Sequence, residues 1–197
     1  MKYIFLVLSI LVGILANAQR TGGGFRGKTY PLNHRKDIIE NYSYFRDIDN
    51  TLSPYVGTWK YTYNGRQIIL VINKEERVFT EDDFNKKKYY TDRLVGRYEV
   101  RDGSGKVLET TLKSDFKDIN LMIKGGVIEP ETSKFMMYFT GAKCGLGNGI
   151  IRLSKSSNNQ LSWTYFPQYI LVSETNKEEC KGEVYLPIGE NLIFTKQ

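Results

Sequence analysis

Apolar and polar residues alternate with a period of two over most of the chain from residue 55 onward, and this pattern restricts the fold more than any other feature. A period of two is typical of a β-strand with one buried face. The first two alternating runs, 55–63 and 66–73, are separated by Asn64 and Gly65. This dipeptide favours a two-residue hairpin turn, because both of its residues tolerate a positive φ. We therefore predict an antiparallel hairpin here.

Further alternating runs follow, most of them separated by Gly, Pro, Asn or Ser, which favour turns. They cover residues 92–101 and 106–112, 119–127 and 134–141, 149–155 and 161–167, and then 169–173, 183–186 and 191–196. About 8–10 short strands in hairpin order predict an all-β fold, an antiparallel up-and-down barrel, with a sandwich as the alternative. Barrel closure removes the sheet edges that recruit other chains. The charged stretch 74–88 is expected to be a loop.

Helix is expected only in short segments that precede the first strand. Ala is the best helix former, and it occurs only at Ala16, Ala18 and Ala142. We expect a short N-terminal helical segment over 37–44, and a helical turn over 47–53. This turn should stop before Pro54, because the residue before a proline avoids the helical conformation.

The N-terminus has the three parts of a secretory signal peptide. Lys2 supplies the positive charge, residues 3–15 are apolar, and Ala16 and Ala18 are the small residues before a cleavage site between Ala18 and Gln19. As a helix the apolar stretch would be about 20 Å long, too short for a hydrocarbon core of about 30 Å. A buried hydrophobic helix and an uncleaved anchor are the alternatives. No Cys lies near the cleavage site, so we do not expect a lipoprotein.

The chain is therefore divided into a signal peptide (1–18), a flexible, Gly- and Arg-rich leader (19–36) and a single β-barrel domain (37–197). The mature chain is expected to be exported and soluble, periplasmic or extracellular, with no membrane span, and its oligomeric state is left open. The net charge is +6, but Lys and Arg alternate with Asp and Glu. The cluster 86–88 follows acidic residues and is interpreted as a solvated loop, so we predict no nucleic-acid binding.

Cys144 and Cys180 are the only cysteines. In an oxidising compartment an isolated pair forms one disulfide, which would stabilise the fold by roughly 3–4 kcal/mol. Two free thiols, or a metal pair that recruits other ligands, are the alternatives. Because His34 is the only His and lies far away in the sequence, a zinc site is disfavoured and no metal is predicted.

Residues 52–61 resemble the start of a lipocalin-type (calycin) β-barrel, in which a helical turn leads into a first strand with a Gly-x-Trp pattern. Gly57 and Trp59 match this pattern. The resemblance implies that Trp59 closes the base of the barrel and that Arg152 is the arginine that stacks on it. It ends at residues 91–93, which read Thr-Asp-Arg where lipocalins have Thr-Asp-Tyr. The chain is also similar to an uncharacterised family of exported bacterial proteins with a Gly-Thr-Trp first strand and a Thr-Lys C-terminal strand, which implies a fold and no activity.

No catalytic or cofactor-binding constellation is apparent. Residues 22–29 match the phosphate-binding pattern GxxxxGK[ST], but they follow a cleaved signal and precede Pro31, whereas the motif requires a strand and a helix. His34 lies in the leader, so no site based on His is expected. A glycoside hydrolase would need two carboxylates about 5–10 Å apart. The candidates are Asp115, Asp118, Glu129 and Glu131. Each lies beside a turn, where acidic residues are common, so we predict no enzyme, no catalytic residue and no cofactor.

The leading hypothesis is a non-enzymatic protein that binds a small apolar or amphipathic molecule in the interior or mouth of the barrel. Strand phases place six large side chains on one face: Tyr61, Tyr98, Met137, Phe139, Trp163 and Tyr165. Aromatic walls suit a ligand pocket, and the alternative is that these residues fill a solid core. The second hypothesis is a cell-envelope or surface protein that binds a protein or polysaccharide through Tyr89, Tyr90 and the loop 86–88. A carboxylate-based hydrolase ranks last.

Overall fold

The structure is a computed structural model and describes residues 27–35, 40–82, 86–115, 120–129, 131–168, 180 and 182–197. The predicted signal peptide, its cleavage site between Ala18 and Gln19, half of the leader (19–26 and 36) and the strand expected over 169–173 lie outside these residues. Within the described ranges, no helix has the length and apolar character needed to cross a membrane.

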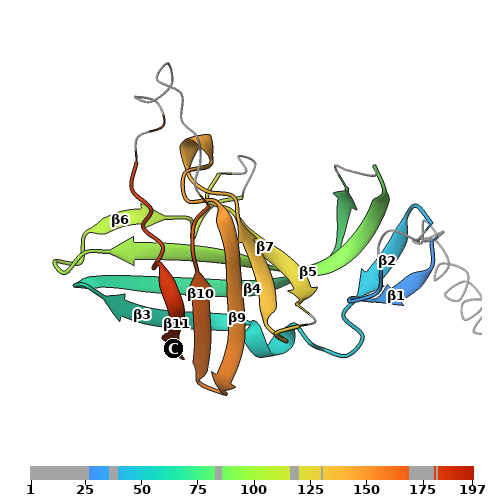
Figure 1. Cartoon of the computed structure of the whole chain (residues 1–197), viewed down its shortest axis with the longest axis horizontal. Coiled ribbons are helices and arrows are strands. Elements are labelled where there is room, and N and C mark those ends of the chain that lie inside the picture. Colours follow the sequence, from blue (N-terminus) through green and yellow to red (C-terminus); the bar gives the residue numbers. More distant parts are fainter. Residues whose placement is uncertain are drawn as a thin grey trace, which may run out of the picture.

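Eight antiparallel strands, all within the described residues, close into a barrel (Figure 1). They are β3 (Gly57–Tyr63), β4 (Arg66–Glu81), β5 (Lys88–Arg101), β7 (Ile123–Ile128), β8 (Phe135–Phe139), β9 (Gly149–Ser157), β10 (Gln160–Tyr165) and β11 (Gly189–Lys196). Each strand pairs with the next, and β11 returns to β3, where Thr195 lies opposite Lys60. Asn64 and Gly65 form the β3–β4 turn with positive φ angles. The predicted all-β, up-and-down barrel is confirmed.

Strands β4 and β5 are longer than the sequence predicted. They have 16 and 14 residues, and the stretch 74–88 expected to be a loop belongs largely to β4. A β-bulge between Glu75 and Val78, with Arg77 at a φ of 53°, keeps the ladder intact. The loop prediction is wrong for residues 74–81, because opposite charges such as Arg93 and Glu75 pair across the two strands, at 2.9 Å.

Three short strands extend the sheet along the edge of β5. They are β1 (Thr29–Pro31), β2 (Ser43–Arg46) and β6 (Val107–Thr110). β2 pairs in parallel with the start of β5, and β6 pairs with its end. The helix predicted over 37–44 is therefore wrong at Ser43 and Tyr44, while residues 37–39 lie outside the described part. The edge of β5 supplies the hydrogen bonds, and the core buries Phe45 completely, so the strand is favoured here.

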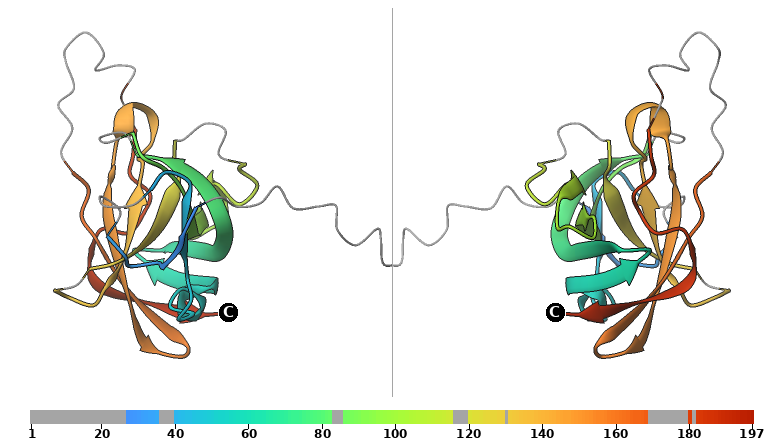
Figure 2. Two further views of the ribbon diagram at one scale, coloured as in Figure 1. Left: turned by 90° about the vertical axis from the view of Figure 1, so that its right-hand side faces the viewer. Right: turned by 90° about the vertical axis from the view of Figure 1, so that its left-hand side faces the viewer.

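A short 3₁₀ helix, η1 (Ser53–Tyr55), covers one end of the barrel, which we call the base. It contains Pro54 instead of stopping before it, because a proline in the first turn lacks only an N–H that has no partner there. The Trp59 indole N–H donates to the Tyr55 carbonyl at 2.9 Å, and the Tyr55 ring packs on Phe135. Lys196, near the C-terminus marked in Figure 2, pairs with Trp59 of β3 close to this end. The opposite end, which carries the β3–β4 turn, is the mouth.

Inward-facing residues from every strand of the barrel fill its interior. The largest fully buried side chains include Trp59, Trp163, Tyr98, Tyr165, Phe135, Phe194, Leu70, Ile72, Leu94 and Ile123. They form one continuous hydrophobic cluster. The barrel is therefore a packed core, and its two ends and outer surface determine what it can contact.

Candidate functional site

The six side chains predicted to share one face all belong to the core, with Tyr61 at its edge. The other five are at most 2% exposed. Neighbouring rings contact one another edge to face: the centroids are 6.3 Å apart for Tyr98 and Phe139, and 6.2 Å for Phe139 and Tyr165. The described pockets open elsewhere, and none of them is lined by any of the six residues.

Residues 182–188, which we call the strap, cover the mouth and lead from Cys180 into β11 (the red segment above β11 in Figure 1). Leu186 is 2% exposed and packs in the core. The buried indole N–H of Trp163 donates to the Pro187 carbonyl at 2.9 Å. The predicted disulfide between Cys144 and Cys180 is present and ties the start of the strap to the loop 141–148.

A pocket of about 230 Å³, the mouth pocket, lies between the strap and the start of β4. Tyr63 and Ile188 are exposed at its rim, and Ile68 is buried. The Arg66 guanidinium forms an ion pair with Glu183 of the strap at 2.6 Å and lies 5.5 Å from the Tyr185 ring centroid. The strap is thus held to the barrel wall by a polar contact as well as by its apolar side chains.

Glu109 of β6 is a carboxyl that sequence reasoning did not single out. The Tyr98 hydroxyl donates to it at 2.5 Å. Burial raises the pKa of Glu109 above its ordinary value, although the hydrogen bond from Tyr98 opposes this change. Burial also raises the pKa of Tyr98, with Glu109 adding to the effect. Glu109 is half-buried, so this hydrogen bond joins the core residue Tyr98 to the barrel surface at β6.

Of the carboxylates considered for hydrolysis, Glu129 is engaged by a cation. Glu129 binds the Arg152 guanidinium at 3.0 Å, and Arg152 lowers the pKa of Glu129. Asp118 lies outside the described residues. Among the residues that the structure describes, no group of three His, Cys, Asp or Glu side chains could hold a metal ion.

Arg152 does not stack on Trp59, contrary to what the lipocalin resemblance implied. In β9 the inner face is formed by Ile151 and Leu153, so Arg152 points outward. The cations over the Trp59 ring are Lys155 and Lys196, with Nζ atoms 4.3 and 5.5 Å from the ring centroid. Burial, together with Lys196, lowers the pKa of Lys155. Gly57 and Trp59 themselves lie at the base.

The tyrosine pair proposed for surface contacts is split between two faces. Tyr89 is only 7% exposed and packs edge-on against Phe45, so its prediction as a surface residue is wrong. Tyr90 packs against Phe79, which is half exposed, and under the Arg77 guanidinium. Neighbouring strand residues point to opposite faces, and the Phe45 side chain packs on the face that carries Tyr89.

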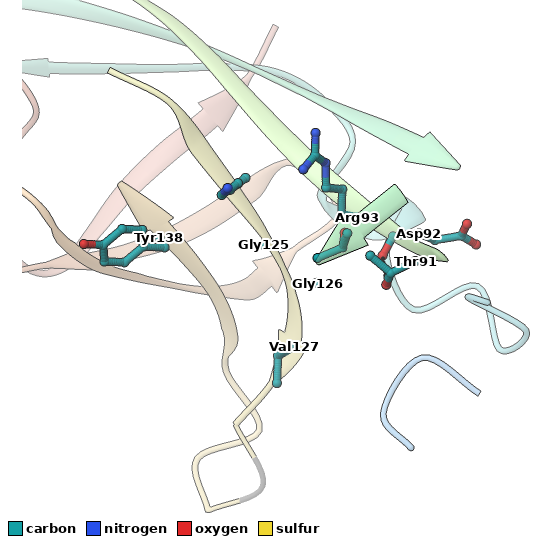
Figure 3. A pocket seen from close by; sticks show the side chains of 9 residues that line it. Thr91, Asp92, Arg93, Gly125, Gly126, Val127 and Tyr138 are labelled. Carbon is teal, nitrogen blue, oxygen red and sulfur yellow. Dashed lines mark hydrogen bonds between the residues drawn. The ribbon is translucent and has the colours of Figure 1, made fainter. Parts of the chain in front are cut away.

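A groove opens on the outside of the barrel where β7 separates from β5 (Figure 3). The ladder between these strands joins only residues 94–96 to 123–125, whereas β2 pairs with β5 at residues 89–91. This side groove has a volume of about 230 Å³. It is lined by Thr80, residues 91–93, residues 124–127 and Tyr138.

Two glycines shape the side groove. In Figure 3, Gly125 and Gly126 lie between Tyr138 on one side and Arg93 on the other. A Cβ on Gly125 would lie 2.2 Å from the Met136 carbonyl oxygen, and one on Gly126 would lie 3.1 Å from the Asp92 carbonyl oxygen. The register with β8 shifts here, so the pair forms a β-bulge that turns β7 away from β5.

The side groove combines apolar walls with one available cation. Tyr138 and Val127 remain 40% and 41% exposed. The Arg93 guanidinium is engaged by Glu75, whereas Lys124 forms no ion pair with a carboxylate in the described part of the chain. An ammonium group beside apolar surface is suited to a molecule that has both an apolar part and an acidic group.

Buried hydrogen bonds fix the β5 wall of the side groove. Asp92, only 1% exposed, accepts from the Tyr44 hydroxyl at 2.6 Å and from the backbone N–H groups of Asp47 and Arg77, both at 2.9 Å. Its side chain points away from Gly126 in Figure 3. Burial and the bond to Asp92 raise the pKa of Tyr44 to about 12. The wall is therefore organised before any ligand arrives.

Sequence reasoning missed the side groove, although one signal was present. Gly125 and Gly126 lie inside the predicted strand 119–127, and glycine within a strand indicates a bulge or a close backbone approach. The other lining residues carry no such signal, because their proximity depends on where β5 and β7 separate.

The whole chain, residues 1–197, matches the model of a protein family described as a family of unknown function (DUF6705). Comparison with curated proteins and comparison with solved structures each found no match.

Proposed function

We propose that this chain, which belongs to the family of unknown function DUF6705, is an exported, non-enzymatic protein that binds an amphipathic ligand in the side groove. The ligand has an apolar part and an acidic group. The observation that carries the proposal is an open apolar groove lined by Lys124 and built on two glycines, of which Gly125 cannot carry a Cβ without a collision and Gly126 has only tight space for one.

Export is supported by two independent features of the chain. Residues 1–18 read as a signal peptide. Cys144 and Cys180 form a disulfide, and disulfides persist in oxidising compartments, the periplasm among them. N-terminal sequencing of the secreted protein tests this part of the proposal, with Gln19 as the expected first residue.

The chemistry of the ligand follows from the lining. An aromatic or aliphatic group of the ligand would cover Tyr138 and Val127, and their exposed apolar surface would be removed from water on binding. A carboxylate, sulfonate or phosphate would approach Lys124. Glu75 already neutralises Arg93, so Lys124 is expected to carry most of the preference for an anion.

A matched pair of fluorescent dyes tests this assignment. 8-Anilinonaphthalene-1-sulfonate has an apolar body and an anionic group, and N-phenyl-1-naphthylamine has a similar body without the charge. Lys124→Gln is expected to weaken binding of the sulfonate by about 2- to 5-fold, the range of an exposed ion pair, and to leave the neutral dye unchanged. Tyr138→Ala should weaken both dyes, because it removes an apolar wall.

The controls are Lys106→Gln, which removes an exposed Lys at a distant turn, and Ile193→Ala, which removes an exposed apolar side chain from β11. Neither should change either affinity. Saturable binding of both dyes that is equally insensitive to Lys124→Gln and Tyr138→Ala would place the ligand elsewhere and reject the side groove.

A second candidate function is contact with an envelope polysaccharide or protein, and the pairing of exposed Phe79 with Tyr90 under Arg77 favours it. Co-sedimentation of the protein with insoluble cell-wall polysaccharide tests this alternative. The co-sedimented fraction should fall with Phe79→Ser and stay the same with Lys124→Gln. A fraction that Phe79→Ser does not change counts against this second function.

A further inference from the structure

We propose that the mouth of the barrel is a second ligand-binding site, which the strap (182–188) occupies as an internal ligand. Its external ligand is a small molecule or peptide that combines an apolar group, a carbonyl acceptor and a carboxylate. The mouth pocket shares no lining residue with the side groove, so the two sites are independent.

The first requirement on any occupant comes from Trp163. Its side chain is 1% exposed, and its indole N–H reaches out of the core to the Pro187 carbonyl at 2.9 Å. Indole can only donate, and a buried N–H without an acceptor is strongly destabilising. A group that replaces the strap must therefore bring a carbonyl or a similar acceptor to the same position.

The second and third requirements come from Leu186 and Arg66. Leu186 is 2% exposed and belongs to the core cluster, although it lies in a segment without regular secondary structure. Three residues earlier, the Glu183 carboxylate lies 2.6 Å from the Arg66 guanidinium, at a point where both side chains remain more than a third exposed. The strap thus presents an apolar side chain, a carbonyl and a carboxylate within five residues, as a short acidic peptide or an acylated amino acid would.

The strap is built to be released more easily than a strand. None of residues 182–188 lies in a described strand, and the segment is fixed by the disulfide before it and by β11 after it. The disulfide keeps the strap at a high effective concentration over the mouth, and it therefore acts as a latch.

A labelled copy of the strap is the probe. A fluorescein-labelled peptide amide of sequence Glu-Val-Tyr-Leu-Pro, which matches residues 183–187, is titrated with the full-length mature protein and followed by fluorescence anisotropy. The Cys144→Ser, Cys180→Ser double variant is expected to bind at least about tenfold more tightly than the wild type, because its own strap competes less. A peptide with Ser in place of Leu should bind neither protein.

Leu186→Ser is a second way to free the mouth for the peptide, and it keeps the disulfide. It tests the proposal if the double variant fails to fold. It removes the apolar side chain by which the strap packs in the core, so the folded variant should also bind the peptide, and Arg66→Gln in this background should weaken binding. The Trp163 indole N–H signal in nuclear magnetic resonance should remain protected from exchange when peptide is bound. Folded variants that bind no peptide, or that bind the Ser peptide equally well, overturn the proposal, whatever the result at the side groove.

Discussion

The base and the mouth of the barrel are closed by the same contact made in two different ways. At the base, the indole N–H of Trp59 donates to the Tyr55 carbonyl at 2.9 Å, and at the mouth that of Trp163 donates to the Pro187 carbonyl at 2.9 Å. Both indoles are at most 1% exposed. At each end a large ring fills the barrel and holds a covering segment by one hydrogen bond.

The two covers differ in how far they lie from the tryptophan along the chain. Tyr55 is four residues from Trp59, whereas Pro187 is 24 residues from Trp163. Longer loops cost more entropy to close. The local cover at the base needs no covalent link, and the distant cover at the mouth is reinforced by a disulfide that spans 36 residues. We therefore expect the mouth to open first and the base to open only with the whole barrel.

Removal of the disulfide is the strongest test of this difference. The double variant Cys144→Ser, Cys180→Ser should lose about 3–4 kcal/mol of unfolding free energy, because its unfolded chain regains the freedom of the cross-linked loop. Urea denaturation gives this value. Hydrogen exchange of the two indole N–H groups should accelerate at Trp163 and follow global unfolding at Trp59. If the exchange rates of both indole N–H groups rise equally, and by more than the loss of global stability explains, the two ends do not open independently.

At the base, the Asp47 carboxylate holds the segment that leads into η1. It accepts from the backbone N–H groups of Thr51 and Leu52 and lies 3.1 Å from the Lys74 ammonium. Asp47→Asn should cost about 1–3 kcal/mol, because buried donors lose a charged acceptor. Denaturant titration measures this loss, and Asp49→Asn at a neighbouring exposed position is the control, with no expected change.

The same residue predicts a pH dependence. Burial opposes ionisation of Asp47, but the hydrogen bonds from Thr51, Lys74 and Leu52 prevail and lower its pKa. A carboxyl with a lowered pKa in the folded state stabilises the protein above its unfolded pKa of about 3.9, and this contribution disappears as the pH falls through the folded value. Wild type and Asp47→Asn should differ in stability at pH 6 and converge toward pH 2, and a constant difference would contradict the assignment.

Local signals predicted much of the barrel. Asn64 and Gly65 need positive φ angles, and the turn has them. The period of two correctly placed Tyr98, Phe139 and Trp163 on one face, because in a strand that phase depends only on the count of residues. The sequence could not show how tightly these side chains pack against one another, since their contacts join strands that are far apart in the chain.

Tertiary pairing explains the errors. Residues 74–81 of the charged stretch extend β4 because opposite charges on β5 pair with them, and Ser43 and Tyr44 form a strand because they pair with the edge of β5. Arg152 was assigned to Trp59 by resemblance, yet the phase of β9 turns it outward. The side groove forms where β7 separates from β5 at Gly125. The pair of glycines is the one local sign of this separation in the sequence.

Lys155 gives the smallest expected effect and tests whether the base has a further support. Its Nζ atom lies 4.3 Å from the Trp59 ring centroid, closer than that of Lys196 at 5.5 Å. Lys155→Gln should cost about 0.5–1 kcal/mol through the lost cation–π contact, and Lys196→Gln should cost less. The difference is measured by denaturant titration in matched buffers.

The two lysines also repel each other, and this sharpens the test. Burial lowers the pKa of Lys155, and Lys196 lowers it further. Lys196→Gln should therefore raise the pKa of Lys155 toward its ordinary value, an effect that nuclear magnetic resonance detects at its Cε. If the contact with the ring stabilises the base, Lys155→Gln should have a smaller effect in a Trp59→Phe background, because phenylalanine attracts a cation less than tryptophan does. An unchanged effect would mean that Lys155 contributes through its hydrogen bond to the Asn158 carbonyl, and the base would then be held by η1 and Asp47 without help from the cation.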